Sequence, residues 1–311
     1  MIIEFYHIDA FEIANFEAIW RQLLLMGVDA RLVAVDGERN TAATGWFDFE
    51  RFDAYCAARG IDYRRSTDPA ATLGVTTQNA GILRDYSKRI RLMYGASPFP
   101  PGWSMQPHSV LPFDAVLVHG QFHADWFTRW LPRERLPIVG YPRYDDFFAG
   151  RIQRHEIRRR WGIDQSRPVL AFMPTWADNT AFDSFFPALL ALRQRFEIVL
   201  RPHHCTLRME PQRMALMRAS GLALLDNAYD LSDIYAGADV VVADVRSGSM
   251  FEACMCQLPT VGMVPDRADL SGWIADMNVG EVIRLCDDPA ELERAVDEVL
   301  VSAEMAERRR A

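Results

Sequence analysis

The sequence predicts an α/β protein made of two doubly wound, Rossmann-like halves whose parallel sheets face each other across a cleft. Short apolar runs of strand length alternate along the 311 residues with segments of helical periodicity, and polar residues gather directly after the strands. Such alternation favours parallel sheets, which bind ligands at the carboxyl ends of their strands. The alternation starts anew after a charged run at 151–160, so we expect one domain over 1–150 and another over 151–288. The remaining segment, 289–311, is expected to be helical and free to pack back toward the first domain.

Composition excludes several classes of protein. Lys and Arg number 34 against 42 Asp and Glu, a net charge of −8 that argues against a nucleic-acid binder, which needs a basic surface. The 5 cysteines show no metal-ligand spacing, and an odd number does not suit a disulfide framework. No apolar run approaches the length of about 20 residues that crosses a bilayer, and the start MIIEFYHID lacks a signal-peptide layout. We expect a cytoplasmic protein without a metal or cofactor, with peripheral attachment to the inner face of the plasma membrane left open.

The first half is predicted to begin as strand, helix and strand. His7 then lies at the carboxyl end of the first strand, although a structural role is the more common one for a single histidine. The segment 97–108 is rich in Pro, Gly and Trp and is typical of an irregular substrate loop. The expected strands are 1–6, 30–35, 74–78, 89–95, 113–118 and 136–139, and the expected helices are 10–25, 47–58 and 123–130.

The second half repeats the alternation. The charged run at 151–160 is interpreted as the inter-domain connection, with a solvated face as the simplest explanation of its arginines. A last amphipathic helix is opened by Asp288 and Pro289. The expected strands are 169–173, 197–200, 222–225, 240–243 and 260–263, and the other expected helices are 184–193, 209–219, 230–236 and 250–256.

The stretch 238–260, ADVVVADVRSGSMFEACMCQLPT, is predicted to be a buried strand, a tight polar loop and a helix. The first N–H groups of a helix have no partner within the helix and lie at the positive end of its dipole, so they attract phosphate. Ser247 and Ser249 would add hydroxyl donors, Gly248 would let a ligand approach the backbone, and Arg246 would add a positive charge. The alternative is that Ser247 only caps the helix.

Four short motifs occur in the order typical of a known family. The segment 140–145 resembles Gly-Tyr/Asn-Pro-Arg-x-Asp, 174–176 resembles the end of Ala-Pro-Thr-Trp, 201–203 resembles Arg-Pro-His, and 238–247 resembles Ser-Asp-x4-Asp-Tyr-Ser-Ser. Together they resemble the CDP-glycerol glycerophosphotransferases, which build teichoic-acid-type poly(glycerol phosphate) and related capsule polymers of the cell envelope. The resemblance spans about 89–264 and implies a GT-B fold. It also implies a donor nucleotide in the second domain and a histidine base in the first.

The sequence departs from the family pattern in two places. Where the family often has Leu-x-His-Gly, this chain has Leu-Met-Tyr-Gly, so Tyr94 stands in the place of the expected base. The loop 247–249 followed by Glu252 also resembles the Ser-Gly-Gly-x-x-Glu loop of UDP-N-acetylglucosamine 2-epimerases and GT-B sugar transferases. A nucleotide-sugar glycosyltransferase or epimerase therefore stays as an alternative. A non-catalytic nucleotide- or glycan-binding module of the same fold is a further one.

The expected partners are a nucleotide-activated donor, with CDP-glycerol favoured, and a glycan or lipid-linked acceptor. Fixed N–H groups and cations would stabilise the charge of the pyrophosphate as its bond breaks. His203 would donate to the phosphate or serve as a hydrogen-bonded loop histidine. Glu252 would contact ribose or favour the helix dipole, and Asp230 would contact the nucleoside or cap a helix. The expected donor-binding residues are Thr175, Arg201, His203, Asp230, Arg246, Ser247, Gly248, Ser249 and Glu252.

Activation of the acceptor requires a base near its attacking hydroxyl group. Because tyrosine replaces the family histidine, the candidates are the other histidines expected near strand ends of the first domain. His7 and His119 rank ahead of His123, and Tyr94 is kept as a catalytic residue by its position. The sequence alone does not choose among them.

Overall fold

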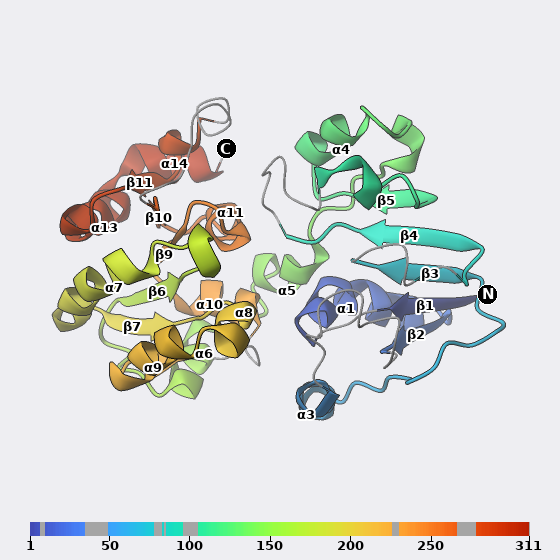
Figure 1. Ribbon diagram of the computed structural model, residues 1–311, viewed down its shortest axis with the longest axis horizontal. Helices are drawn as coiled ribbons and strands as arrows, with labels where there is room; N and C mark the ends of the chain where they lie inside the picture. The colour runs from blue at the N-terminus through green and yellow to red at the C-terminus, as the bar shows by residue number, and fades with distance from the viewer. Residues whose placement is uncertain are drawn as a thin grey trace. The chain divides into compact units, whose positions relative to one another are not determined.

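The computed structural model describes residues 1–6, 10–34, 49–77, 83, 85–95, 105–225, 230–265 and 278–310. Contacts between Cα atoms divide the chain into two compact units (Figure 1). The N-terminal unit holds the chain up to Tyr94 and from Pro98 to Asp145, and the C-terminal unit holds nearly all of the rest. Each unit is built around its own sheet.

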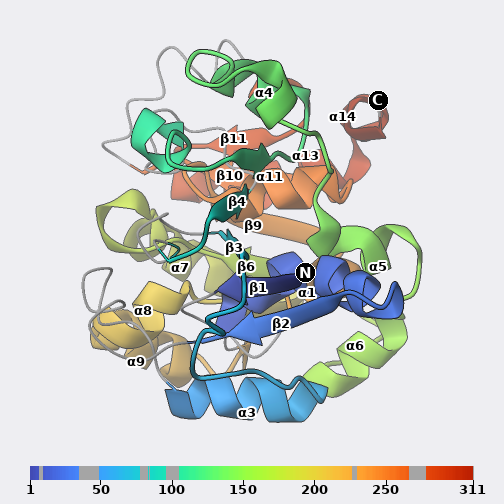
Figure 2. The same ribbon diagram turned by 90° about the vertical axis from the view of Figure 1, so that its right-hand side faces the viewer.

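The N-terminal unit contains a parallel sheet in the order β2-β1-β3-β4-β5 (Figure 2). Helix α1 covers one face through Ile13, Phe16 and Trp20, which recur at helical spacing and are buried with Phe5. The indole of Trp20 donates to the Ala30 carbonyl at 3.0 Å and so fixes α1 to β2. The described elements are β1 (Ile2–Tyr6), α1 (Ala10–Leu25), β2 (Asp29–Val33), α3 (Phe49–Arg59), β3 (Leu73–Thr76), β4 (Lys88–Leu92), β5 (Ala115–Leu117) and α4 (Gln121–Phe127).

The strand expected at 136–139 is wrong. Ile138 forms only an isolated bridge with Val118 beside β5. Pro137 has no N–H to give to a ladder, and Gly140 turns the chain away with a φ of 73°. The bridge leaves Ile138 and Val139 exposed at the edge of the sheet.

The C-terminal unit has a second parallel sheet in the order β11-β10-β9-β6-β7-β8. The chain starts in the middle at β6, proceeds to β7 and β8 on one side, and returns to β9, β10 and β11 on the other. The strand order therefore reverses between β6 and β9, which is where doubly wound sheets bind their ligands. The strands are β6 (Val169–Met173), β7 (Glu197–Leu200), β8 (Ala223–Leu224), β9 (Val240–Asp244), β10 (Thr260–Met263) and β11 (Arg284–Cys286).

Strands β6 and β9 are buried at every position, as the apolar runs 169–173 and 240–243 predict. Helix α13 packs on β10, β11 and α7, so the described part of 289–310 belongs to this unit. The sequence did not predict β11. The helices of this part of the chain are α5 (Asp145–Phe148), α6 (Arg154–Trp161), α7 (Phe182–Ala191), α8 (His204–Met209), α9 (Pro211–Ala219), α10 (Leu231–Gly237), α11 (Gly248–Met255), α13 (Leu292–Val301) and α14 (Ala303–Arg310).

Two arginines of α6 bind another helix, so the interpretation of the arginines at 151–160 as a solvent-exposed face is wrong for them. Arg158 is only 7% exposed, and it donates to the Gly237 carbonyl at 2.8 Å and to the Asp239 carboxylate at 2.5 Å. Arg154 donates to the Ala236 carbonyl at 3.1 Å. The last carbonyls of a helix have no partner within it, so α6 caps the carboxyl end of α10.

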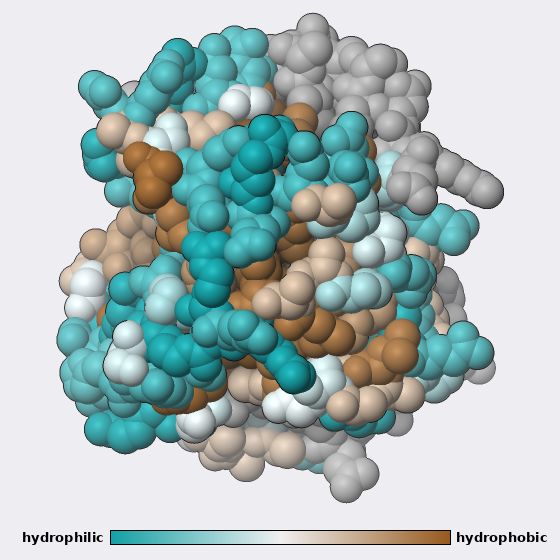
Figure 3. Space-filling model, turned by 90° about the vertical axis from the view of Figure 1, so that its left-hand side faces the viewer, coloured by the Kyte–Doolittle hydropathy of each residue, from teal (hydrophilic) through white to brown (hydrophobic). Residues whose placement is uncertain are grey.

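The face of the C-terminal unit that carries α7, α9 and α13 is mostly hydrophilic with apolar residues gathered in its middle (Figure 3). The large apolar side chains exposed on this unit include Leu216 and Val301. Among the described helices, none combines the length and the apolar character that a bilayer crossing requires.

Substituting Gly237 with alanine is expected to destabilise the C-terminal unit. A Cβ there would lie 2.3 Å from Cη2 of Trp161, so α6 and α10 would have to separate. Overpacking of this kind costs about 1–3 kcal/mol, or a fall in Tm of about 2–4 °C for each kcal/mol. Thermal unfolding followed by circular dichroism measures it. Gly280→Ala is the control, because no described atom lies within 4 Å of its Cβ, and equal Tm values for the two variants would contradict the packing argument.

Candidate active site

The carboxyl ends of β7, β6 and β9 lie side by side, because β6 pairs with both of the other strands. The loops that follow these strands carry most of the residues expected at the donor site. Thr175 follows β6, His203 follows β7, and Ser247 follows β9. With Asp244 at the end of β9 they form what we call the switch-point cluster.

Asp244 joins the parts of the switch-point cluster. Its carboxylate is fully buried and accepts hydrogen bonds from the Thr175 amide at 2.6 Å, the Ala181 amide at 2.7 Å and the Thr180 hydroxyl at 2.8 Å. Burial raises the pKa of the Asp244 carboxyl to about 6, while the three donors oppose that rise. Asp244 therefore fixes the loop after β6 and the start of α7 to the end of β9.

Ser247 caps α11, as the simpler interpretation of the sequence supposed. Its backbone is extended, and its hydroxyl oxygen accepts from the Ser249 amide at 3.2 Å. The Ser247 amide donates to the Asp244 carbonyl at 2.9 Å, so the cap is tied to the end of β9. Within the described part of the chain the Gly248 amide has no acceptor. Capping thus uses one amide and leaves another available at the positive end of the helix.

His203 is a neutral ring that accepts a hydrogen bond in this structure. It is the N-cap of α8, and its Nδ1 accepts from the Cys205 amide at 3.2 Å, which leaves the ring proton on Nε2. Burial holds the pKa of His203 well below its usual range, and the neighbouring His204 and Arg201 add to that. The ring also lies parallel to Trp176, with 6.0 Å between centroids. A locked, uncharged ring of this kind would present a fixed N–H to an anion.

The other predicted donor residues around the sheet edge are Thr175, Arg201 and Arg246. Thr175 is 8% exposed, and its carbonyl accepts from the Thr206 hydroxyl at 3.5 Å. Arg246 is partly exposed and donates to Asn179 at 3.2 Å. Arg201 directly follows β7 and hydrogen bonds to the adjacent Pro202 carbonyl. The structure therefore brings two guanidinium groups to the loops that leave β7 and β9.

Asp230 and Glu252 have partners inside the protein. Asp230 caps α10 by accepting from the amide and the hydroxyl of Ser232, both at 2.9 Å. Glu252 is 3% exposed, and the Tyr235 hydroxyl lies 3.4 Å from its carboxylate. A contact between either residue and a nucleoside would compete with these hydrogen bonds.

The structure describes only some of the candidates for the catalytic base of the N-terminal unit. His7 lies outside the described residues, and Tyr94 follows β4 partly buried. His119 follows β5, hydrogen bonds through Nε2 to the Met93 carbonyl at 3.1 Å, and stacks on Tyr141 with 3.9 Å between ring centroids.

Burial makes His119 and His123 weak bases. It lowers the pKa of His119 to about 3, with the nearby His123 adding to the effect and the bond to Met93 opposing it. Burial likewise lowers the pKa of His123 to about 4. A general base works best with a pKa near the operating pH, so both rings are better suited to hydrogen bonding than to taking a proton.

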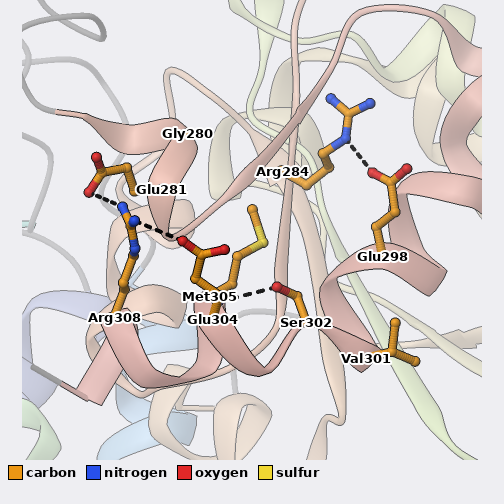
Figure 4. A pocket seen from close by; sticks show the side chains of 9 residues that line it. All are labelled: Gly280, Glu281, Arg284, Glu298, Val301, Ser302, Glu304, Met305 and Arg308. Carbon is orange, nitrogen blue, oxygen red and sulfur yellow. Dashed lines mark hydrogen bonds and ion pairs between the residues drawn. The ribbon is translucent and has the colours of Figure 1, made fainter.

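A separate pocket of about 490 Å³ lies at the outer edge of the C-terminal sheet (Figure 4). Its arginines already have acidic partners: Arg284 pairs with Glu298 at 2.7 Å, and Arg308 pairs with Glu304 at 2.8 Å and with Glu281. The pocket therefore offers no unpaired cation to a phosphate and lies along β11, far in strand order from the switch point. Its lining residues are Gly280, Glu281, Arg284, Glu298, Val301, Ser302, Glu304, Met305 and Arg308.

One described group of side chains has the composition of a metal site. The possible ligand atoms of His203, His204 and Cys205 all lie within 4.8 Å of one another. Nδ1 of His203 is already engaged by the Cys205 amide, and a closed structural zinc site takes four ligands. These three residues alone therefore would not complete such a site.

The model of the family described as CDP-glycerol:poly(glycerophosphate) glycerophosphotransferase matches residues 109–310. The chain belongs to this family. No curated protein matches the chain by sequence. The predicted family is confirmed.

Solved structures show the fold of this glycerophosphotransferase family member. The wall teichoic acid polymerase TagF is 15% identical, with a TM-score of 0.64 over 99% of this chain and 81% of that chain. A UDP-GlcNAc 2-epimerase from Neisseria meningitidis bound to UDP-GlcNAc is 10% identical, with a TM-score of 0.64 over 99% and 94%. A putative UDP-N-acetylglucosamine 2-epimerase from Listeria monocytogenes is 12% identical, with a TM-score of 0.65 over 99% and 90%. The predicted GT-B class with two parallel-sheet domains is confirmed.

The family match includes every predicted donor residue, whereas His7 and Tyr94 precede it. Sequence reasoning found the loops of the switch-point cluster but gave no role to Asp244, which binds the loop after β6 to the end of β9. Its position at the end of an apolar strand was a usable signal, because a buried carboxylate needs several donors. The stacking of Trp176 on His203 had no signal in either segment alone.

Substituting His119 with phenylalanine is expected to reduce the acid sensitivity of the protein. A histidine with a folded pKa near 3 and an unfolded pKa near 6.5 contributes stability above pH 6.5 that is lost as the pH falls toward 3. By pH 5 that loss is about 2 kcal/mol. The difference in Tm between pH 7.5 and pH 5 should therefore be about 5 °C smaller in the variant. His155→Gln, which removes an exposed histidine, is the control, and an unchanged difference in His119→Phe would contradict the effect of burial.

Proposed function

We propose that this protein transfers glycerol phosphate, or a related polyol phosphate or sugar, from a CDP-activated donor to a glycan or lipid-linked acceptor of a cell-surface polymer. The observation that carries the proposal is the switch-point cluster. There a neutral ring N–H on His203 follows β7 and the amide-bearing start of α11 follows β9, the two strands that flank β6 in a sheet with nucleotide-binding strand order. Family membership supports the transferase class. A structure of TagF soaked with CDPG is 13% identical to this chain with a TM-score of 0.62. That protein was studied with this compound, which supports CDP-glycerol as the proposed donor here.

The transfer reaction depends on stabilising the negative charge of the phosphates more than on covalent catalysis by the protein. In the transfer of glycerol phosphate, the acceptor oxygen forms a bond to the outer phosphorus, the bond from that phosphorus to the bridging oxygen breaks, and CMP leaves with the negative charge. The amide of Gly248, the hydroxyl group of Ser249, the Nε2–H of His203, and the guanidinium groups of Arg201 and Arg246 are proposed to stabilise that charge. The hydroxyl of Thr175 is proposed to hold a phosphate oxygen.

The acceptor proton needs a separate base. His119 and His123 bind a proton only at strongly acidic pH, so His7 stands as the proposed base and Tyr94 as a proposed contact of the reacting hydroxyl group. Asp230 and Glu252 are proposed to contact the nucleoside. On binding, they would replace their hydrogen bonds with Ser232 and Tyr235 by hydrogen bonds to the ligand.

A second candidate is a UDP-sugar transferase or epimerase of the same fold. The epimerase from Neisseria meningitidis, solved with UDP-GlcNAc, covers 99% of this chain at 10% identity. The loop from Ser247 to Ser249 followed by Glu252 favours this candidate. Turnover of CDP-glycerol against UDP-GlcNAc separates the two, and binding without any turnover would indicate a non-catalytic module.

CDP is expected to stabilise the protein more than UDP or GDP. A ligand that binds only the folded state at 100 times its Kd adds about 2.7 kcal/mol, which a thermal shift assay detects. Ser247→Asp should lose most of this shift, because aspartate still caps α11 but repels a phosphate.

Ser247→Asn is the matched control for that experiment, since asparagine caps the helix without a charge. It should keep most of the CDP-induced shift and the same Tm without ligand. If no nucleotide raises the Tm of the unsubstituted protein, the donor site is disproved.

His203→Asn should separate the capping role of this residue from its proposed role toward phosphate. Asparagine supplies the N-cap acceptor that Nδ1 now provides to Cys205 but has no equivalent of the Nε2–H. We expect nearly unchanged thermal stability and a fall in kcat of about 100-fold, the usual result of removing a donor to transition-state charge. His203→Ala should lose both stability and activity. Full turnover in His203→Asn would show that the ring only caps α8.

A further inference from the structure

Polar side chains with buried atoms form a connected group in the N-terminal unit. The Tyr141 hydroxyl donates to Oδ1 of Asn15 at 3.2 Å, the Tyr141 ring stacks on His119 at 3.9 Å, and His119 meets the edge of His123 at 5.5 Å between centroids. Asn15 is fully buried and His123 is 7% exposed. We call this set the Asn15–His123 chain.

Three polar atoms of the Asn15–His123 chain are buried and have no partner among the described residues. They are Nδ2 of Asn15, Nδ1 of His119 and Nε2 of His123. Native interiors pair nearly all buried polar atoms, so each exception calls for a bound group or water. Here three exceptions occur in one connected cluster.

We call these three unpartnered atoms the open atoms. Whether each one donates or accepts a hydrogen bond determines which chemical group could bind to them. Nδ2 of Asn15 carries protons and needs an acceptor. Nε2 of His119 is used toward the Met93 carbonyl, so its Nδ1 holds a lone pair and needs a donor. A carboxylate or phosphate would leave His119 unsatisfied, and an ammonium group would leave Asn15 unsatisfied. Hydroxyl groups both donate and accept, and the uncharged rings suit a neutral ligand.

The location is consistent with substrate binding. His119 directly follows β5, and its Nε2 is bonded to the residue directly after β4. These are carboxyl ends of adjacent parallel strands, where open α/β sheets bind ligands. Asn15 lies on α1, the helix between β1 and β2, and α1 packs against the segment that follows Tyr141. All of these residues belong to the N-terminal unit.

We propose that the Asn15–His123 chain binds hydroxyl groups of a polyol or sugar acceptor, with Asn15 donating to a hydroxyl oxygen and His119 accepting a hydroxyl proton in a hydrogen bond. This inference rests on the proposed transferase function, because it names the acceptor chemistry of that reaction. His119 recognises the acceptor here and does not deprotonate it. The site is separate from the switch-point cluster, which belongs to the other unit.

Histidine side-chain NMR on the full chain tests the proposal directly. The protein is labelled with 15N-histidine and titrated with glycerol, with methyl α-D-glucopyranoside and with 1-propanol, all without nucleotide. We expect a saturable shift of the Nδ1 resonance of His119 with glycerol or the glucoside, and none with 1-propanol. The exposed His155 on α6 serves as the internal reference and should not move.

The opposite result identifies a different occupant. If Nδ1 of His119 responds to none of the probes, or equally to 1-propanol, the open atoms hold a buried water and the proposal is overturned. This outcome is independent of the donor site, because CDP binding is measured separately by thermal shift.

Two variants link the site to turnover. His119→Phe keeps a ring against Tyr141 but removes Nδ1, and should raise the KM for the acceptor about tenfold while leaving the KM for the donor unchanged. Tyr141→Phe is the matched control, because it removes a hydrogen bond of the same chain without touching an open atom. Equal acceptor KM values in the two variants, with both folded, would count against acceptor recognition by His119.

Discussion

The carboxylate of Asp244 accepts three hydrogen bonds from a loop and a helix start that lie far away in the sequence. These bonds cross the boundary between β6 and β9, where the strand order reverses. A buried carboxylate without such donors is strongly unfavourable, so the donors and the acid require each other. The loop of Thr175 and the cap of α11 acquire their positions from this arrangement, because both are bonded to Asp244. The geometry of the proposed phosphate site is therefore set by a residue that need not touch the ligand.

The histidines in the two proposed sites share one property. Burial lowers the pKa values of His119, His123 and His203 alike, so all three rings are uncharged near neutral pH. A neutral ring has one donor and one acceptor, and the structure uses one nitrogen of His119 and one nitrogen of His203. His203 accepts a backbone N–H and keeps a donor, whereas His119 donates to a carbonyl and keeps an acceptor. The first suits an anionic phosphate and the second suits a hydroxyl group.

Periodicity and strand composition predicted most of the fold. The bounds of α1, β6, β7 and β10 agree with the expected ranges, because polar or small residues directly follow their apolar patterns and mark the boundaries clearly. The three-residue strand β11 is too short to show a period, and 136–139 looked like a strand because its apolar composition hides the missing N–H of Pro137. The local sequence pattern alone does not reveal a very short strand or a missing backbone donor.

The candidate sites were less predictable than the fold. The loops after β6, β7 and β9 followed from the position of polar residues at strand ends. The burial of His119 and the capping contacts of Arg158 depend on segments remote in sequence. Asp230 caps a helix, which the sequence offered only as an alternative, and the contact between Glu252 and Tyr235 was not predicted. Side-chain partners of this kind are decided by tertiary packing, which one sequence does not display.

The capping of α10 by α6 has a practical consequence for dissecting the molecule. Arg154 and Arg158 precede the first strand of the C-terminal sheet, yet they bind the end of the helix that leads into β9. A shortened protein that starts at β6 would keep every strand of that sheet and lose this clamp. The excised lobe would then fray beside β9, which follows Asp239 and ends in Asp244. A useful truncation must start upstream of Arg154.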